Sequence, residues 1–384
     1  MGCKGPIMSS AWQALGGMGG VYIRVVAGNT FGELLRLTSF GASHDPFIGG
    51  VLDGCPAGLA MDISAVQGEL DRRRPGGTLL GTAREEADRI ELVSGVMEGM
   101  TLGTPIGFLI RNNDTRPEDY DTLKETYRPG HADLTWELKY GRRDHRGGGR
   151  SSARETAVRV AAGAIARQLL ATAGVQVNAW VAQVGEVSMD GPYQRLDHAA
   201  TWSNPVRCPE PLTAARMQAL IEQVRSEGDS VGGIISCVLH GVPAGLGEPV
   251  FDKLQADLGK AMLGINAVKG FQLGSGFAAA SMRGSEHNDA FVPGKGRIAT
   301  ATNRSGGVQG GISNGEDIVF DVAFKPVATI AQAQMTVDRG GKPMVLEAKG
   351  RHDPCVVPRA VPIVEAMACL VIADHWLRQR SARL

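Results

Sequence analysis

The chain has 384 residues, 43% hydrophobic and 21% charged, a composition typical of a folded globular protein. Its 40 Lys and Arg residues are balanced by 40 Asp and Glu residues, which argues against a general nucleic-acid binder with its basic excess. No uninterrupted apolar run approaches the roughly 20 residues of a membrane span, so we expect no membrane association. The six cysteines are widely spaced without a Cys-x-x-Cys pair, which predicts neither a disulfide framework nor a metal site and favours a reducing, cytoplasmic location.

The beginning of the chain differs in character from the rest. Residues 1–27 have no sustained apolar core and therefore make a poor signal peptide, and position 6 lacks the Ser or Thr of a myristoylation motif. We predict that 1–27 is a disordered N-terminal extension and that 28–384 forms a single domain.

Two segments far apart in the chain repeat one pattern. Residues 51–74 and 238–261 both begin with Val-Leu-x-Gly-x-Pro-Ala-Gly-Leu, in which a strand pattern ends in a Pro/Gly turn before an amphipathic helical pattern. Seven of these nine positions are identical, which favours duplication over chance. We therefore predict two related halves around a shared core, each containing a strand, a turn and a helix.

Between the repeats, the stretch 142–155 (RRDHRGGGRSSARE) concentrates five arginines and three glycines before a helical pattern. Ser152 and Glu155 have the spacing of a capping box, and Gly174 is predicted to end the helix. The glycines let backbone N–H groups approach a ligand, while Arg150 and Arg154 add donors at a helix N-terminus, which favours anions. The alternative is a solvated basic loop with an ordinary cap.

The remaining elements point to an α+β protein. Alternating apolar residues predict strands at 104–111 and 318–324, and helical spacing predicts helices at about 213–227 and 360–378. Strands and helices do not alternate as in a doubly wound sheet, so we expect helices packed against mostly antiparallel sheets.

Other short motifs depend on their context. Arg, Lys or His again stands beside Gly or Pro at 71–76, 128–133, 325–326 and 349–354, which in a neutral chain indicates one site for a multiply anionic ligand. The Gly-x-Ser-x-Gly match at 311–315 is followed by a strand pattern rather than the helix that a nucleophile elbow needs. We expect His198, His240 and His375 to be structural or surface residues, whereas His145 could be either functional or not.

Taken together, these segments resemble the chorismate synthase family from about Gly28 to Trp376. The matching blocks are 28–44, 71–76, 127–166, 265–270, 284–289, 303–315, 325–330 and 350–367. The resemblance implies a β-α-β sandwich, with helices between mostly antiparallel sheets and an internal pseudo-twofold repeat. It also implies a homotetramer.

The resemblance further implies a reaction. Chorismate synthases are carbon-oxygen lyases of aromatic amino acid biosynthesis that remove phosphate and a C6 hydrogen from 5-enolpyruvylshikimate-3-phosphate by 1,4 anti elimination, using reduced FMN. An external flavin reductase is expected, and the alternative is a bifunctional form that itself reduces FMN with NADPH. An RNA-binding Arg/Gly protein is a weaker reading, because aromatic residues for base stacking make up only 5% of the chain.

Residue roles carry over by resemblance. His44 would keep the flavin correctly protonated, His131 would face the leaving phosphate, and Asp353 would accept a proton from the flavin. The residues implied in FMN binding are Arg150, Ser151, Ser152, Asn266, Ala267, Gly310, Lys325, Pro326, Val327, Ala328, Thr329 and Arg351. The residues implied in binding the substrate are Ser43, Arg73, Arg128 and Arg154, with Arg73 also a candidate for binding NADP.

Two sites depart from the family pattern. The usual Gly-Glu-Ser-His-Gly reads Gly-Ala-Ser-His-Asp, so that Ala42 replaces an acid before the histidine and Asp45 adds one after it. Leu79 stands where a further anion-binding arginine is usual, which puts the affinity for substrate in question.

Overall fold

The computed structural model describes residues 28–74, 86–114, 120, 123–294, 296–347 and 353–383. The expected extension at 1–27, the departure at Leu79 and the FMN-binding residue expected at Arg351 lie outside these ranges.

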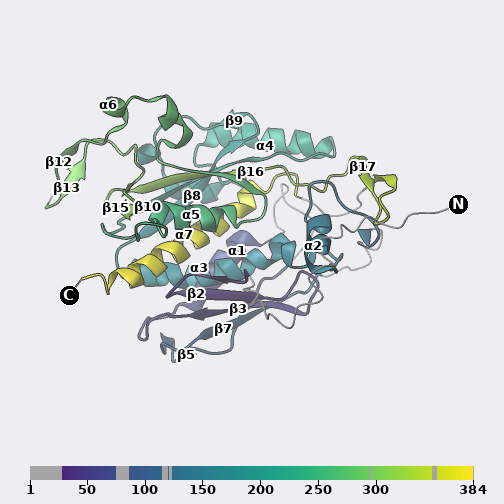
Figure 1. Cartoon of the computed structure of the whole chain (residues 1–384), viewed down its shortest axis with the longest axis horizontal. Coiled ribbons are helices and arrows are strands. Elements are labelled where there is room, and N and C mark those ends of the chain that lie inside the picture. Colours follow the sequence, from purple (N-terminus) through teal and green to yellow (C-terminus); the bar gives the residue numbers. More distant parts are fainter. Residues whose placement is uncertain are drawn as a thin grey trace, which may run out of the picture.

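Two five-stranded antiparallel sheets form the outer layers of the molecule (Figure 1). The first has the order β1-β2-β3-β7-β4, with strands Thr30–Phe31, Arg36–Phe40, Phe47–Asp53, Ile106–Arg111 and Ile90–Leu92. The second has the order β11-β16-β10-β8-β9, with strands Val268–Leu273, Ile318–Phe324, Gly233–His240, Gln176–Val184 and Val187–Ser188. In reverse, the second sheet repeats the chain order of the first over four strands, β8-β10-β16-β11 against β2-β3-β7-β4, so β3 and β10 are the equivalent central strands. The fifth strand lies at the same edge in both sheets, but β1 precedes its neighbour in the chain whereas β9 follows its neighbour.

Four helices fill the layer between the sheets (Figure 1). They are α1 (Ile63–Arg73), α3 (Thr156–Ala171), α5 (Leu254–Leu263) and α7 (Val357–Gln379). Helices α3 and α7 approach so closely that a Cβ on Gly163 would lie 2.4 Å from the Cβ of Ala366. A further helix, α4 (Pro211–Ser226), lies on the outer side of the second sheet. The predicted β-α-β sandwich is confirmed.

The repeated segments confirm the predicted duplication. Each contains a central strand, β3 or β10, followed by a turn and a helix, α1 or α5. The first glycines of the shared motif, Gly54 and Gly241, have φ of +83° and +72°, and the second, Gly58 and Gly245, have +84° and +103°. The motif is shared because both turns need left-handed backbone at the same two positions.

The other predicted elements are present with small shifts of boundary. Strands β7 and β16 correspond to 104–111 and 318–324, and helices α4 and α7 to 213–227 and 360–378. The capping box was wrong. The Ser152 hydroxyl accepts the N–H of Arg154 and caps a 3₁₀ turn at Ala153–Glu155, while Glu155 pairs with Arg159 instead of reaching back to Ser152.

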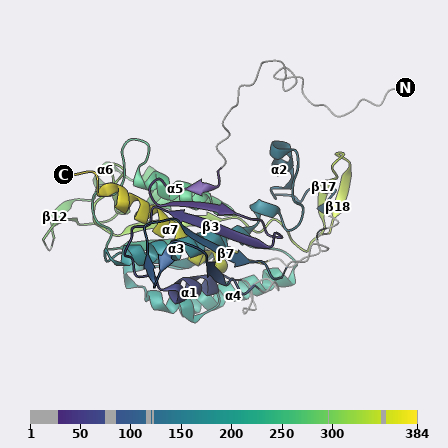
Figure 2. The same ribbon diagram turned by 90° about the horizontal axis from the view of Figure 1, so that it is seen from below.

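Shorter strands and helices lie outside the two sheets and the four central helices. They are β5 (Val96–Met97), β6 (Met100–Thr101), α2 (Asp133–Tyr140), α6 (Gly284–His287), β12 (Phe291–Pro293), β13 (Ile298–Thr300), β14 (Val308–Gln309), β15 (Ile312–Ser313), β17 (Gln334–Val337) and β18 (Pro343–Leu346). Helix α2 stands beside the β17–β18 hairpin (Figure 2), where Arg339 of the hairpin turn pairs with Glu137.

Helix α7 is long and apolar enough to cross a membrane by length and composition, although the sequence has no uninterrupted apolar run of that length. Its apolar window is 89% buried inside the protein, against α3, α5 and β8. It is therefore the core helix of the sandwich, on which both halves pack.

Candidate active site

The ends of the four central helices meet at one cavity of about 430 Å³. Arg73 ends α1 and Asn266 follows α5, while Arg154 precedes α3 and Arg359 lies in the first turn of α7. Because α1 and α5, and likewise α3 and α7, hold equivalent places in the two halves, the cavity lies where the halves join.

Most of the residues implied by resemblance line this cavity. They are Arg73, Arg128, His131, Ser151, Ser152, Arg154, Asn266, Ala267, Lys325, Val327, Ala328, Thr329 and Asp353. Ser43, His44, Arg150, Gly310 and Pro326 do not contribute to its lining.

Two of the cavity arginines share one buried carboxylate. Asp88 is fully buried and accepts hydrogen bonds from Arg73 Nη1, at 2.6 Å, and from Arg154 Nη1. Burial alone would raise the pKa of Asp88, but the charges of the two arginines outweigh it and lower that pKa. Burial lowers the pKa of Arg73 to about 10, so this guanidinium stays charged at neutral pH. The two arginines are thus fixed in place before any ligand binds.

A second carboxylate, Asp133, joins Arg128 to His131. Its Oδ2 accepts Nε of Arg128 at 2.8 Å, and its Oδ1 accepts Nη2 of Arg128 and faces Nδ1 of His131, both at 2.9 Å. Burial would raise the pKa of Asp133, yet hydrogen bonds from Arg128 and His131 hold it well below its usual range.

The three glycines of the basic stretch separate the two candidate catalytic histidines. Gly147, Gly148 and Gly149 have φ of +59°, +90° and +55°. A Cβ on Gly147 would lie 2.6 Å from Cε1 of His44, and one on Gly148 would lie 3.0 Å from Cε1 of His131. The glycines are therefore needed for close packing against these rings as well as for their backbone conformation.

His44 lies behind this turn rather than in the cavity lining. Its Nδ1 is 3.0 Å from the Ser43 hydroxyl, which donates to the carbonyl of Arg146, and its ring packs edge-on against Tyr120, a cavity residue. Asp45, one of the two departures from the family motif around His44, stabilises the 42–45 turn, because its carboxylate accepts the N–H of Ala42 at 2.8 Å.

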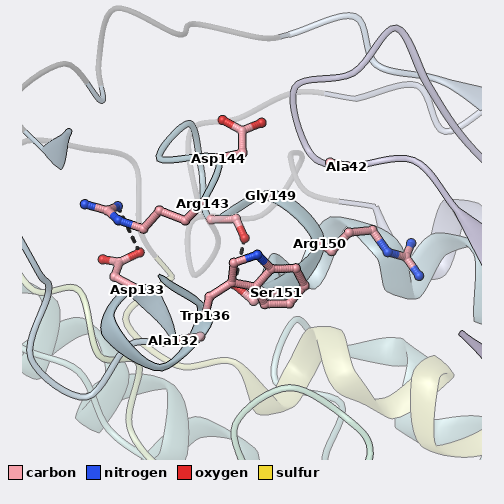
Figure 3. A pocket seen from close by; sticks show the side chains of 10 residues that line it. Ala42, Ala132, Asp133, Trp136, Arg143, Asp144, Gly149, Arg150 and Ser151 are labelled. Atoms are coloured by element: carbon pink, nitrogen blue, oxygen red, sulfur yellow. Dashed lines mark hydrogen bonds and ion pairs between the residues drawn. The ribbon is translucent and has the colours of Figure 1, made fainter. Parts of the chain in front are cut away.

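Arg150 points away from the cavity. Its guanidinium donates to the carbonyls of Gly41 and Ser39 and to the side chain of Asn29. Arg150 and Trp136 both line a smaller, neighbouring pocket of about 110 Å³. Figure 3 shows the guanidinium of Arg150 extending away from Trp136. Its interactions hold the glycine turn against the end of β2.

The part of the cavity lining that comes from the second half of the chain carries an ion pair and an amide side chain with one hydrogen bond. Arg359 donates through Nη1 to Oδ2 of Asp353, and both side chains line the cavity. Asn266 donates to the carbonyl of Ser151 at 2.9 Å, whereas its buried Oδ1 has no hydrogen-bond partner among the described residues. Burial, followed by the charge of Lys269, lowers the pKa of Lys325.

Sequence reasoning missed Asp88, Asp133 and Arg359. Asp133 stands two residues after His131 in the 128–133 segment, and Arg359 lies in a matching block, so the sequence held a signal for both. Asp88 gave no local signal, because its partners are 15 and 66 residues away in the chain.

Comparison with known proteins agrees with the geometry. The model of the family described as chorismate synthase matches residues 35–377. The chain is 57% identical over 357 residues to a chorismate synthase of Christiangramia forsetii, covering 93% of this chain and 99% of the relative. It is also 57% identical over 353 residues to one of Parabacteroides distasonis, covering 92% and 99%. A crystal structure of a chorismate synthase superimposes with a TM-score of 0.72 at 29% identity, covering 91% of this chain and 93% of the other.

Proposed function

The chain belongs to the chorismate synthase family, lyases of the shikimate pathway, and we propose that it catalyses the family's reaction in the cavity at the ends of the four central helices. In that reaction the C–O bond to phosphate and the C6–H bond of 5-enolpyruvylshikimate-3-phosphate break, and a second ring double bond forms. The chain is then a carbon-oxygen lyase acting on a phosphate.

The charge of the cavity is the observation that carries this proposal. Its described lining holds five Arg and Lys side chains and one carboxylate, that of Asp353. The substrate brings two carboxylates and a phosphate, and FMN brings another phosphate, so an excess of cations is required. Since Arg73, Arg128 and Arg154 are already held by buried carboxylates, little side-chain entropy is lost when they bind an anion.

A flavin suits the wall where the second half of the chain meets Ser151 and Ser152. Asn266 offers a buried amide oxygen without a partner among the described residues there, and Lys325 supplies a cation. We propose that Ser151, Ser152, Asn266, Ala267, Lys325 and 327–329 hold reduced FMN. When bound there, reduced FMN would supply transient electron density for the elimination, and these residues would hold it against the substrate.

The protein's own groups orient the reactants and manage protons. Arg73, Arg128 and Arg154 bind the anionic groups of the substrate. His131 lies beside the leaving phosphate, and His44, behind Gly147, maintains the protonation state of the site. The Asp353 carboxylate, paired with Arg359, accepts a proton. Arg150 serves this site indirectly by holding the glycine turn.

Several wider properties belong to the same proposal. We propose one catalytic domain over 28–384, a homotetramer, a cytoplasmic location and reduced FMN delivered by a separate flavin reductase. The two relatives align over 99% of their length without a long unmatched insert in this chain, which supports a monofunctional enzyme rather than one that also uses NADPH.

The test is an anaerobic assay of the purified full chain with 5-enolpyruvylshikimate-3-phosphate. With dithionite-reduced FMN we expect chorismate and inorganic phosphate in equal amounts. Oxidised FMN, alone or with NADPH, should give neither product. Absence of chorismate in the first arm contradicts the proposed activity, and chorismate in the NADPH arm contradicts the need for a separate reductase.

A further inference from the structure

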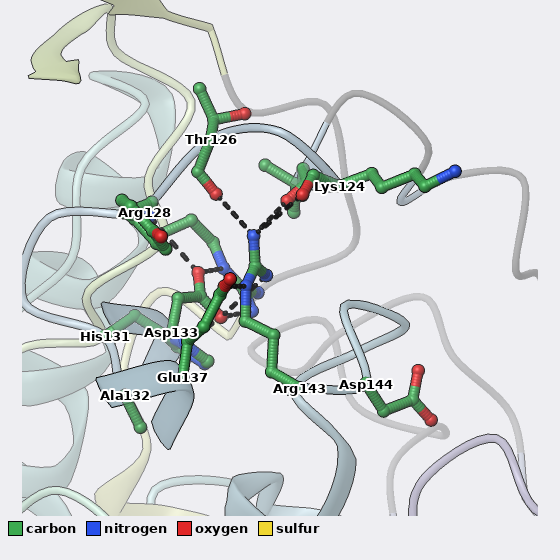
Figure 4. Close-up of polar contacts among 12 residues, drawn as sticks. Lys124, Thr126, Arg128, His131, Ala132, Asp133, Glu137, Arg143 and Asp144 are labelled. Carbon is green, nitrogen blue, oxygen red and sulfur yellow. Dashed lines mark hydrogen bonds and ion pairs between the residues drawn. The ribbon is translucent and has the colours of Figure 1, made fainter. Parts of the chain in front are cut away.

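Asp133 is a heavily bonded carboxylate behind the cavity lining, although the resemblance gives it no role. It begins helix α2 and is 3% exposed (Figure 4). Four donors surround it: the backbone N–H, Nε and Nη2 of Arg128 and the Nδ1 of His131, at 3.1, 2.8, 2.9 and 2.9 Å. One carboxylate thus fixes both a substrate-binding arginine and a candidate catalytic histidine.

The bonding fixes the tautomer of His131. Arg128 and the His131 ring hold the pKa of Asp133 well below its usual range despite burial, so this carboxylate is ionised and can only accept hydrogen bonds. The Nδ1 of His131 must therefore carry a hydrogen. Proton exchange is left to Nε2, the atom that a Cβ on Gly148 would approach to 3.2 Å.

Arg143 holds Asp133 from the far side. Its Nη1 lies 3.6 Å from Oδ1 of Asp133, and its Nε donates to Glu137 one turn along α2. Its Nη2 donates to backbone carbonyls of Leu123, Lys124 and Thr126 (Figure 4). Asp133 is consequently held on a helix that is anchored to the neighbouring segment, which leaves its carboxylate little freedom to turn away from His131.

Resting on the proposed function, we propose that Asp133 is a positioning residue that directs Nε2 of His131 toward the leaving phosphate and holds Arg128 for the substrate. Removing its charge then has two separable effects. The His131 ring loses its fixed tautomer, which lowers kcat. Arg128 loses the charge of its partner and one of the two oxygens that accept its side-chain hydrogen bonds, which raises KM for the substrate.

The test combines Asp133→Asn with His131→Ala. Alone, Asp133→Asn should lower kcat by roughly 10- to 100-fold, the scale seen when the hydrogen-bond partner of a metal-bound histidine is removed. In the His131→Ala background it should change kcat by less than about twofold, because the residue through which it acts is gone. The rise in KM through Arg128 should persist in both backgrounds.

A matched control lies on the same helix. Glu137 is also a carboxylate bonded to Arg143 but does not contact His131, so Glu137→Gln should leave kcat unchanged within about twofold. Loss of kcat in Glu137→Gln equal to that in Asp133→Asn would show a general disturbance of α2 and would overturn the assignment.

A spectroscopic readout avoids dependence on the variants. Nitrogen-15 NMR of the wild-type chain, at a pH where the ring is neutral, should show His131 with hydrogen on Nδ1. A dominant Nε2–H form would overturn the proposal directly, even if Asp133→Asn failed to fold.

In the kinetic experiment, unchanged kcat in His131→Ala alone would instead refute the role of His131 in the proposed function. Equal loss of kcat from Asp133→Asn in both backgrounds would refute the positioning role.

Discussion

The two halves of the molecule share the order of four strands and a strand–turn–helix unit, yet they bring different chemistry to the cavity. The first half supplies Arg73, Arg128, His131 and Arg154, together with the buried carboxylates behind them. The second half supplies Asn266, Ala267, Lys325, residues 327–329 and the Asp353–Arg359 pair. Duplication gave the two halves one scaffold, and different residues at equivalent helix ends made the site asymmetric.

This asymmetry suggests a division of labour. The rigid cations of the first half suit an anionic substrate and its leaving phosphate. The second half, with its amide, its backbone turns and one carboxylate, suits a flavin and proton acceptance. Substitutions confined to one half or the other test that division.

The largest effect is expected at the proton-handling group of each half. Asp353→Asn and His131→Ala should each lower kcat by roughly 10²-fold or more, the scale of a positioned proton-transfer group. Deuterium at C6 of the substrate should slow Asp353→Asn more than the wild type, because hydrogen removal becomes limiting. The isotope effect should shrink in His131→Ala, where phosphate departure becomes limiting. Equal isotope effects in the two variants would break the assigned roles.

A smaller effect is expected from loosening the arginines of the first half. Asp88→Asn removes the charge shared by Arg73 and Arg154 and should raise KM for the substrate about tenfold, equivalent to ~1.4 kcal/mol. The affinity for reduced FMN should change little. Asp71→Asn is the control, because this exposed residue of α1 pairs with Arg74 at 3.8 Å and does not line the cavity. A larger loss of flavin affinity than of substrate affinity in Asp88→Asn would contradict the division.

In the second half, Asn266→Ala should weaken binding of reduced FMN about fivefold, because the buried amide bonds one wall of the cavity to the other. Fluorescence or calorimetric titration under anaerobic conditions measures this change. Gln332→Ala, which removes an exposed amide bonded to Glu227, serves as the control and should have no effect. An unchanged flavin affinity in Asn266→Ala would remove this residue from the cofactor site.

The smallest effect concerns stability at low pH. The folded pKa of Asp133 is depressed, so its ionised form stabilises the protein above its unfolded pKa of about 3.9, and this contribution is lost as pH falls further. Asp133→Asn should therefore flatten the fall in free energy of unfolding between about pH 5 and pH 3. Denaturant unfolding at several pH values measures this free energy. A parallel pH dependence in the variant and the wild type would contradict the prediction.

Sequence reasoning succeeded where the determinants are local. The Gly54 and Gly241 turns, the α7 helix and the alternating strands β7 and β16 follow from short-range pattern. It failed where a side chain finds its partner through the fold. The capping box at Ser152 was wrong because the chain first makes a 3₁₀ turn while Arg154 reaches Asp88, a contact 66 residues away.

The same limit explains the candidate site. Resemblance proposed Arg73, Arg128 and Arg154 but not the carboxylates that orient them, and it could not show Arg150 directed away from the cavity toward Gly41. Those features depend on which groups tertiary packing brings together, which spacing along the chain does not encode.

The most direct test of the division between the halves is anaerobic titration of substrate alone and reduced FMN alone against three variants. These are Asp88→Asn, Asn266→Ala and the double variant. The account predicts weaker substrate binding in the first, weaker flavin binding in the second, and the sum of both in the third, because Asp88 and Asn266 share no hydrogen-bond partner. Either single variant weakening both ligands to the same extent would contradict it.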